Sequence, residues 1–311
     1  MTPTPGDGST LVRFERLLAT LASVAAPLTL VTALLFYYGY AASRAQYRYF
    51  GVDVDTIGLS TQDYVMRSPQ VLLTPLLVLL AVGAVGVVVH AAVRRRVAAV
   101  FAGRPHVADV TVVRSSSYLR GVRQVARLLI VAGYCVLAAG AVLLVTYPVL
   151  RRWTAYPLVT PLLMALGSAL AGYGHRLAGL LHPRDRSRSG TVVAMWLVLT
   201  ASVFWATATL AEASGRGLAH DLAQRLDPLP GVILDTTERL YLTSPGIEET
   251  VLPVEPDQRF RYRYRHLRLL IQGPERLFLV PDTWSASNST LVIPMDDDSV
   301  RVQFRFVNDP P

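Results

Sequence analysis

Five long stretches of this sequence carry almost no charge, and they restrict the fold more than any other feature. They cover about residues 17–40, 71–93, 128–150, 157–181 and 191–211. About 20 apolar residues in a helix cross ~30 Å of hydrocarbon, so each stretch is long enough to span a bilayer. Inside a bilayer the backbone must satisfy its own hydrogen bonds, which favours helices. The pattern predicts a five-helix transmembrane bundle in residues 1–213.

The first and fourth stretches differ from the others at their ends. Arg13 and Arg16 precede the first, as in a signal peptide, but its apolar run is longer than the usual 7–15-residue signal core. We therefore expect an uncleaved signal anchor. It ends in aromatic side chains typical of a membrane interface, namely Phe36, Tyr37, Tyr38 and Tyr40. The fourth stretch carries His175 and Arg176 near its end.

Arginine supplies all the positive charge of the side chains, apart from histidine, because the sequence contains no lysine. Fourteen arginines lie in residues 1–16, 94–127 and 175–190, whereas the segments on the opposite side, 41–70 and 151–156, hold five. Cytoplasmic connections are enriched in positive charge, so we expect a cytoplasmic N-terminus and an extracytoplasmic C-terminal domain. Without the fourth span, the C-terminal domain would instead lie in the cytoplasm.

The segment between the first two spans contains polar residues suited to loops and helix caps. Ser60 and Asp63 have the spacing of a capping box, which predicts a short interfacial helix from about Thr61. Asp53, Asp55 and Asp63 supply carboxylates but lack the glycine and the ligand spacing of a calcium loop. We therefore expect loop carboxylates here and no metal site.

Several short runs of the chain carry a resemblance to other proteins. They are Phe50-Gly-Val-Asp, Gly58-Leu-Ser-Thr-Gln-Asp-Tyr64, Arg67-Ser68, Leu267-Arg-Leu-Leu, Phe278-Leu-Val-Pro and Asp296-Asp-Asp-Ser-Val-Arg. In these runs the chain resembles uncharacterised multi-pass membrane proteins of actinobacteria. The resemblance implies a bacterial plasma membrane and transfers no catalytic or binding residue.

Residues 214–311 predict a juxtamembrane helix followed by a small β-rich extramembrane domain. Leu218, Leu222 and Leu226 recur every four positions, so an amphipathic helix should end before Pro228. Alternation and turn residues predict strands at 232–234, 239–242, 259–268, 276–280, 291–293 and 300–306. We expect an antiparallel meander of five or six strands, closed as a small sandwich or barrel, and an α+β membrane protein as the fold class.

One predicted strand alternates arginine with aromatic residues. With a period of two, Phe260, Tyr262, Tyr264 and His266 share one face. The opposite face carries Arg259, Arg261, Arg263 and Arg265. Four guanidinium groups on one face need anions or water, so the face is either a contact surface or a solvated face partly neutralised by aspartates. A contact surface would fit phosphate, a teichoic-type polymer, lipid headgroups or an acidic protein, whereas nucleic acid is not an expected partner of an extracytoplasmic domain.

Motifs for catalysis and for metal or cofactor binding do not occur in the sequence. It has no Gly-x-Ser-x-Gly elbow, no His-Glu-x-x-His motif and no phosphate-binding loop. His175 and His182, with Asp185 nearby, would lie about two helical turns or roughly 10 Å apart, too far to share a metal. The run Asp296–Asp298 fits a turn better than a calcium site. We expect no enzymatic activity and no cofactor.

Two features of the spans leave a choice of function open. The fourth span contains small residues that let helices approach closely, among them Gly167, Ala171, Gly172 and Gly174, which pack within one bundle or against a second subunit or membrane partner. The fifth span contains hydroxyls that line a path or bond to neighbouring helices, namely Thr200, Ser202, Thr207 and Thr209. No Asp, Glu, Arg or Lys lies deep in a span, which argues against ion-coupled transport.

The sequence therefore favours a non-enzymatic integral membrane protein whose outer β-domain binds an anionic polymer, a lipid or a protein. Such a protein would serve as an anchor, a sensor or an assembly subunit. The alternative is an oligomeric channel or passive transporter with the β-domain as a cap.

Overall fold

The computed structural model describes residues 7–102, 110–150, 153, 155–181, 188–253, 258–285 and 287–305, although the side chains of residues 7–27 and of some other helix-end residues lie outside the description. The chain forms two compact units, one of residues 1–71 with 211–311 and the other of residues 72–210. All of α1 (Asp7–Tyr49) and the end of α7 (Arg188–Gln224) cluster with the sheet, and the predicted domain boundary at residue 213 stays a prediction.

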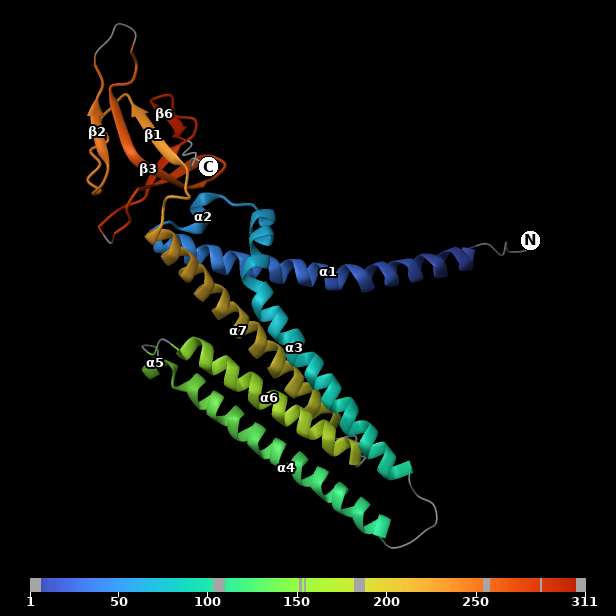
Figure 1. Ribbon diagram of the computed structural model, residues 1–311. Coiled ribbons are helices and arrows are strands. Elements are labelled where there is room, and N and C mark those ends of the chain that lie inside the picture. The colour runs from blue at the N-terminus through green and yellow to red at the C-terminus, as the bar shows by residue number, and fades with distance from the viewer. Residues whose placement is uncertain are drawn as a thin grey trace, which may run out of the picture. The chain divides into compact units, whose positions relative to one another are not determined.

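Seven helices and six strands make up the described part of the chain (Figure 1). The helices are α1 (Asp7–Tyr49), α2 (Val54–Ile57), α3 (Thr61–Ala102), α4 (Val110–Val145), α5 (Tyr147–Leu150), α6 (Tyr156–Leu181) and α7 (Arg188–Gln224). The strands are β1 (Gly231–Thr236), β2 (Glu248–Val251), β3 (Tyr262–Gln272), β4 (Arg276–Pro281), β5 (Leu291–Pro294) and β6 (Val300–Arg305).

Four of these helices are long and apolar enough to cross a membrane. They are α3, α4, α6 and α7. The predicted spans at 71–93, 157–181 and 191–211 lie within α3, α6 and α7, whereas α4 ends at Val145, before the end of the predicted span at 128–150. The first predicted span, 17–40, lies within α1, but many of its side chains are outside the description, so a fifth span stays a prediction. The structure thus supports a helical membrane protein with four candidate spans and a β-rich C-terminal region.

The small residues of α6 lie where α6 packs along α4 within the same chain. A Cβ on Gly167 would stand 2.6 Å from the backbone nitrogen of Leu137, and a Cβ on Gly174 would stand 3.0 Å from the carbonyl oxygen of Ala126. Ala171 is fully buried against Gly133 of α4. Backbones this close leave no room for side chains between them, which is the role of small residues in membrane helices. Gly172 instead faces Met195 of α7, at 3.3 Å.

In the other unit, three helices converge near the sheet through two close backbone contacts. A Cβ on Gly39 of α1 would lie 2.0 Å from the carbonyl oxygen of Tyr64 at the start of α3. A Cβ on Gly215 of α7 would lie 2.1 Å from the carbonyl oxygen of Ala42. Neither position has room for a larger side chain, so the end of α1 is held against both neighbours.

The segment that joins α1 to α3 forms part of a core shared with the sheet. Phe50, Val52, Val54 and Ile57 are buried there. They pack with α1, α3, α7, β3 and β4 side chains, among them Tyr47, Tyr64, Ala219, Leu226, Leu270, Ile271, Phe278 and Val280. We call this cluster the junction core. The Thr290 hydroxyl donates to the Phe50 carbonyl at 2.6 Å, and the Phe50 ring lies 5.0 Å from that of Trp284.

The predicted capping box at Ser60 and Asp63 is present. The Ser60 amide donates to the Asp63 carboxylate at 2.8 Å, and the Asp63 amide donates to the Ser60 hydroxyl at 3.2 Å. The helix that begins at Thr61 is the candidate span α3 itself, 42 residues long. The prediction of a short, separate interfacial helix was therefore wrong.

The six strands form one antiparallel sheet in the order β5-β4-β3-β1-β6, with β2 also paired to β3. The strand number agrees with the prediction, but the chain is not a simple meander, because β1 lies between β3 and β6. Residues 239–242 are not a strand, and Tyr241 has a left-handed φ of 48°. Phe306, the predicted end of the last strand, lies outside the described residues.

The sheet has two differently covered faces. On one face, Val232, Leu234, Tyr264, Leu267 and Leu279 belong to a second buried cluster. On the other face, part of β3 and β4 packs into the junction core. Gly273, in the β3–β4 turn, approaches the Ile57 carbonyl so closely that a Cβ there would lie 2.2 Å away. The rest of this second face, on β1, β3 and β6, carries the arginines.

Candidate anion-binding face of the sheet

The face carries arginines because alternation along two strands places them together. Asp235 on β1 pairs in register with Arg263 on β3 and with Arg301 on β6, and Gly231 pairs with Arg268 and Arg305. Side chains that are opposite each other on neighbouring strands lie on the same side of a sheet. We call the side with Arg263, Arg265, Arg268, Arg301 and Arg305 the arginine face.

A β-bulge at His266 interrupts the predicted alternation. Val232 pairs with Leu267 but Leu234 pairs with Tyr264, so two residues of β3 stand opposite one residue of β1. His266 has a left-handed φ of 63°, which is uncommon outside glycine and suits the extra residue of a bulge. The bulge keeps Tyr264 and Leu267 buried and turns His266 outward. The prediction that His266 shares a face with Tyr264 was therefore wrong.

Asp235 is the centre of a neutralised cluster on the arginine face. Its side chain has 0% exposure, and it accepts Arg263 Nε at 2.7 Å and Nη2 at 3.1 Å. Arg301 donates to the same carboxylate through Nε at 3.1 Å and through Nη2. Burial opposes a charge on Asp235, but the hydrogen bonds from both arginines outweigh burial and hold the pKa of this carboxyl below its ordinary value.

Because of this cluster, Arg263 is not available for the predicted contact with an anion. The bond to Asp235 raises the pKa of Arg263, which is a structural partner of a buried carboxylate. The guanidinium of Arg301 also lies 4.8 Å from the centre of the Phe260 ring. Asp235 and Arg301 were missed from sequence, because the partners of Asp235 are 28 and 66 residues away along the chain.

A second cluster surrounds the outward-facing His266. Its Nδ1 lies 3.0 Å from a carboxylate oxygen of Asp282, and its Nε2 lies 3.4 Å from Glu248. Arg268 Nε donates to the other oxygen of Asp282 at 2.7 Å. Arg268 also donates through Nη1 to the Asp227 carbonyl at 2.9 Å, which ties β3 to the segment after α7.

The remaining arginines have weak partners or none. Arg259 lies 3.8 Å from Asp298, and both side chains are exposed, so the pair contributes little. Within the described part of the chain, the exposed Arg261, Arg265 and Arg305 have no ion pair. Thus the structure divides the four arginines predicted as a contact surface. Arg263 is bound internally, Arg259 is loosely paired, and Arg261 and Arg265 form no ion pair with a described residue, although Glu248 of β2 stands opposite Arg265.

Two of these free arginines open onto a groove of ≈ 490 Å³. Its polar and charged side chains come from β2, β3, β6 and the end of β4, namely Glu248, Arg265, His266, Arg268, Asp282 and Arg305. None of these lining side chains is a hydroxyl or a thiol, so the groove offers hydrogen-bond donors and positive charge but no nucleophile of those types. Such donors suit recognition of carboxylate or phosphate oxygens.

The aspartates considered as metal ligands have other roles. Asp53 caps α2, Asp55 accepts a hydrogen bond from Tyr40 at 3.2 Å, and Asp63 caps α3. Asp297 accepts the Ser299 amide at 2.8 Å in a turn, and the hydrogen bond from the Ser299 side chain, followed by this backbone bond, lowers the pKa of Asp297. Among the described residues, no group of three or more possible ligands gathers to hold a metal. His182 and Asp185 lie outside those residues.

Comparison of the chain with protein-family models, with curated proteins and with solved structures found no match. The resemblance to actinobacterial membrane proteins therefore stays a prediction.

Proposed function

We propose that the chain is a non-enzymatic integral membrane protein whose sheet domain binds an anionic polymer, lipid or protein through the arginine face. Arg265 and Arg305 carry this proposal, because they are exposed at one groove and form no ion pair with a described residue, and because the arginines of the groove outnumber its acids Glu248 and Asp282. The neighbouring Arg263, Arg268 and Arg301 are already bound to Asp235 and Asp282. An anion that reaches the groove would complete the charge balance there.

We also propose that this domain lies outside the cytoplasm. The junction core joins residues 47–64 to the sheet, so these residues and the sheet would lie on the same side of the membrane. A chain that returns to the same side makes an even number of crossings, and the four candidate spans between these segments satisfy this requirement. The arginine-rich segments 94–127 and 175–190 then lie on the other side, in the cytoplasm of a bacterial plasma membrane.

The alternative function, an oligomeric channel, has no comparable support. Each hydroxyl that was considered as a pore lining bonds to a carbonyl of its own helix: Thr200 to Trp196, Ser202 to Val198, Thr207 to Val203 and Thr209 to Ala206. The small residues of α6 pack on α4 and α7 of the same chain and do not require a second copy.

The test compares the purified full-length protein with Arg265→Gln/Arg305→Gln, using inorganic polyphosphate and polyglutamate as probes. We expect the wild type to bind at least one probe in a salt-sensitive manner. We expect the double variant to bind at least about tenfold more weakly, because each lost charge-assisted hydrogen bond contributes about 1.5–3 kcal/mol.

Arg276→Gln is the matched control, because Arg276 is exposed at the far end of the sheet and pairs in register with Pro294. Binding by this control should equal that of the wild type. The proposal is wrong if wild type and double variant bind both probes equally, or if neither probe binds while the sheet is folded.

A further inference from the structure

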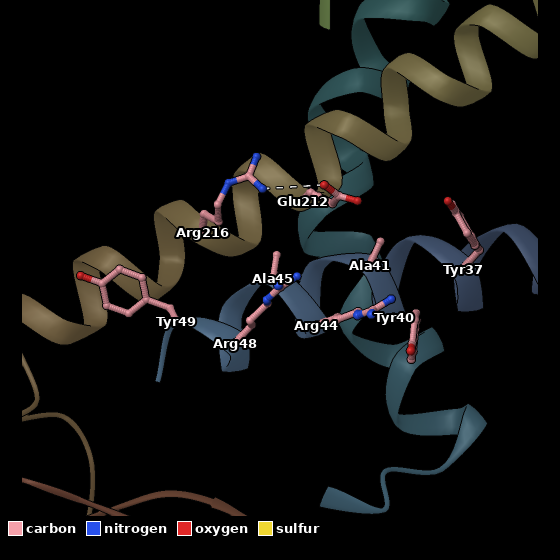
Figure 2. Close-up of a pocket in the computed structure, with 9 residues that line it drawn as sticks. All are labelled: Tyr37, Tyr40, Ala41, Arg44, Ala45, Arg48, Tyr49, Glu212 and Arg216. Carbon is pink, nitrogen blue, oxygen red and sulfur yellow. Dashed lines mark ion pairs between the residues drawn. The ribbon is translucent and has the colours of Figure 1, made fainter. Parts of the chain in front are cut away.

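A groove of ≈ 440 Å³ lies between α1 and α7, away from the arginine face (Figure 2). Helix α1 contributes Tyr37, Tyr40, Arg44, Arg48 and Tyr49, and α7 contributes Glu212 and Arg216. All of these residues belong to the unit that contains the sheet. The groove thus combines guanidinium groups with phenol rings.

The groove lies where the apolar parts of both helices end. On α1, no charged residue occurs between Leu17 and Tyr40, and Arg44 is the first charge after that run. On α7, Glu212 is the first charge after the predicted span. The close contact of Gly215 with Ala42 brings the ends of these two apolar runs together. Tyrosine at the end of an apolar helix is typical of the headgroup region of a bilayer.

The charge in the groove is positive and incompletely paired. Glu212 is the only carboxylate among the lining residues, and Arg216 lies 3.7 Å from it, one helical turn away (Figure 2). Arg44 and Arg48 are exposed on successive turns of α1, and no ion pair joins either of them to a described residue. Two like charges at this spacing repel each other, so an anion between them would be favoured.

Two tyrosines that line the groove make polar contacts with side chains outside it. The Tyr40 hydroxyl donates to Asp55 at 3.2 Å, and the Tyr49 hydroxyl lies 3.4 Å from Nδ1 of His220 on α7. These contacts orient the rings and leave the guanidinium groups of Arg44 and Arg48 as the available donors. The groove is therefore a pre-arranged donor site.

We propose that this groove binds the phosphate headgroup of an anionic phospholipid. Guanidinium groups fit phosphate oxygens, and tyrosine rings suit the boundary between headgroup and acyl chain. The lipid acyl chains would lie along the exposed apolar residues earlier on α1, where Leu28, Leu30 and Val31 are 65%, 62% and 51% exposed. A soluble anion would gain nothing from that apolar surface, which is why the site favours a lipid.

The test measures lipid bound to the purified full-length protein in nanodiscs or detergent, by native mass spectrometry. Phosphatidylglycerol and phosphatidylcholine of equal chain length are the probes. We expect the wild type to retain phosphatidylglycerol preferentially. Arg44→Gln/Arg48→Gln should bind it roughly 25-fold more weakly, because each of the two arginines typically contributes about fivefold near an anionic surface.

Three controls make the result decisive. Arg225→Gln removes an exposed arginine of the same unit that does not line the groove, and it should leave the preference unchanged. Arg44→Lys/Arg48→Lys keeps the charge and should retain most of the preference, and an unchanged thermal unfolding midpoint of the glutamine variant would show that its loss is not due to misfolding. Glycerol phosphate at millimolar concentration should not displace the lipid.

Three outcomes would overturn the proposal. They are an equal preference of the wild type for both lipids, an equal effect of Arg225→Gln, and full displacement by glycerol phosphate, which would show a site for free phosphate. Because this groove is separate from the arginine face, failure here leaves polyphosphate binding by Arg265 and Arg305 unaffected.

Discussion

At the scale of single residues, Asp235 has the greatest effect on the sheet. It is fully buried and stands between Arg263 and Arg301 on adjacent strands. Removing one partner of a buried charge cluster leaves the remaining charges uncompensated, which is costlier than losing an exposed pair. The alternation of arginine with aromatic residues was visible in the sequence, but the acid that neutralises Arg263 of this run, together with Arg301 of β6, was not.

Asp235→Asn should destabilise the sheet by about 3 kcal/mol, the typical cost of breaking a buried ion pair. Hydrogen exchange of the β1 amides, residues 231–236, measures this loss directly. Asp298→Asn is the control, because the pair that Asp298 forms with Arg259 is exposed, and its effect should stay within about 0.5 kcal/mol. Equal protection of β1 in both variants would contradict this role of Asp235.

The stability of the sheet should also depend on pH through Asp235. The folded-state pKa of this carboxyl is lowered, so its stabilisation is fully present above the unfolded-state pKa and is lost as the pH falls through the folded value. We expect the protection factors of the β1 amides, corrected for the pH dependence of intrinsic amide exchange, to decrease as the pH falls below about 4, the ordinary range of an aspartate. Asp235→Asn should show a shallower pH dependence than the wild type, and an identical profile would refute the assignment.

At the scale of elements, the sequence predicted what depends on local patterns. Long apolar runs located α3, α4, α6 and α7, and the spacing of Ser60 and Asp63 located the start of α3. Two features depend on distant contacts and were not predictable. The bulge at His266 exists because Tyr264 and Leu267 are both buried against β1, and residues 50–57 became core because β3 and β4 cover them.

Close packing of α6 on α4 leads to a prediction for Gly167. In Gly167→Ala, the new Cβ would lie 2.6 Å from the Leu137 nitrogen, so the helices must separate. We expect a loss of about 1–3 kcal/mol, as for other overpacked positions. Gly83→Ala on α3 is the control, because nothing lies within 4 Å of its new Cβ. Thermal unfolding in detergent should separate the two variants, and equal midpoints would contradict the packing.

At the scale of the whole molecule, the junction core constrains the path of the chain through the membrane. Residues 47–64 and the sheet share one core, so under the proposed topology the candidate spans between them would cross the membrane an even number of times. The predicted fourth span, which carries His175 and Arg176 near its end, would be needed to make this number even. Without it, the sheet and residues 47–64 would be on opposite sides of the bilayer.

Reporter fusions test this path. Alkaline phosphatase, which is active only outside the cytoplasm, should be active when fused after Pro311 and inactive when fused after Pro183. A green fluorescent protein at the same two positions should give the opposite pattern. Phosphatase activity at Pro183 together with inactivity at Pro311 would reverse the proposed orientation.

The junction core has a consequence for biosynthesis. A ribosome makes the chain from the N-terminus, so Phe50, Val54 and Ile57 emerge long before Phe278 and Val280, which cover them in the finished protein. With the proposed topology, these early apolar side chains would remain uncovered by the sheet until the candidate spans between have been inserted and the last strands have been made. A chaperone or the insertion machinery itself would have to shield them during that interval. Formation of this core would then report that membrane insertion is complete.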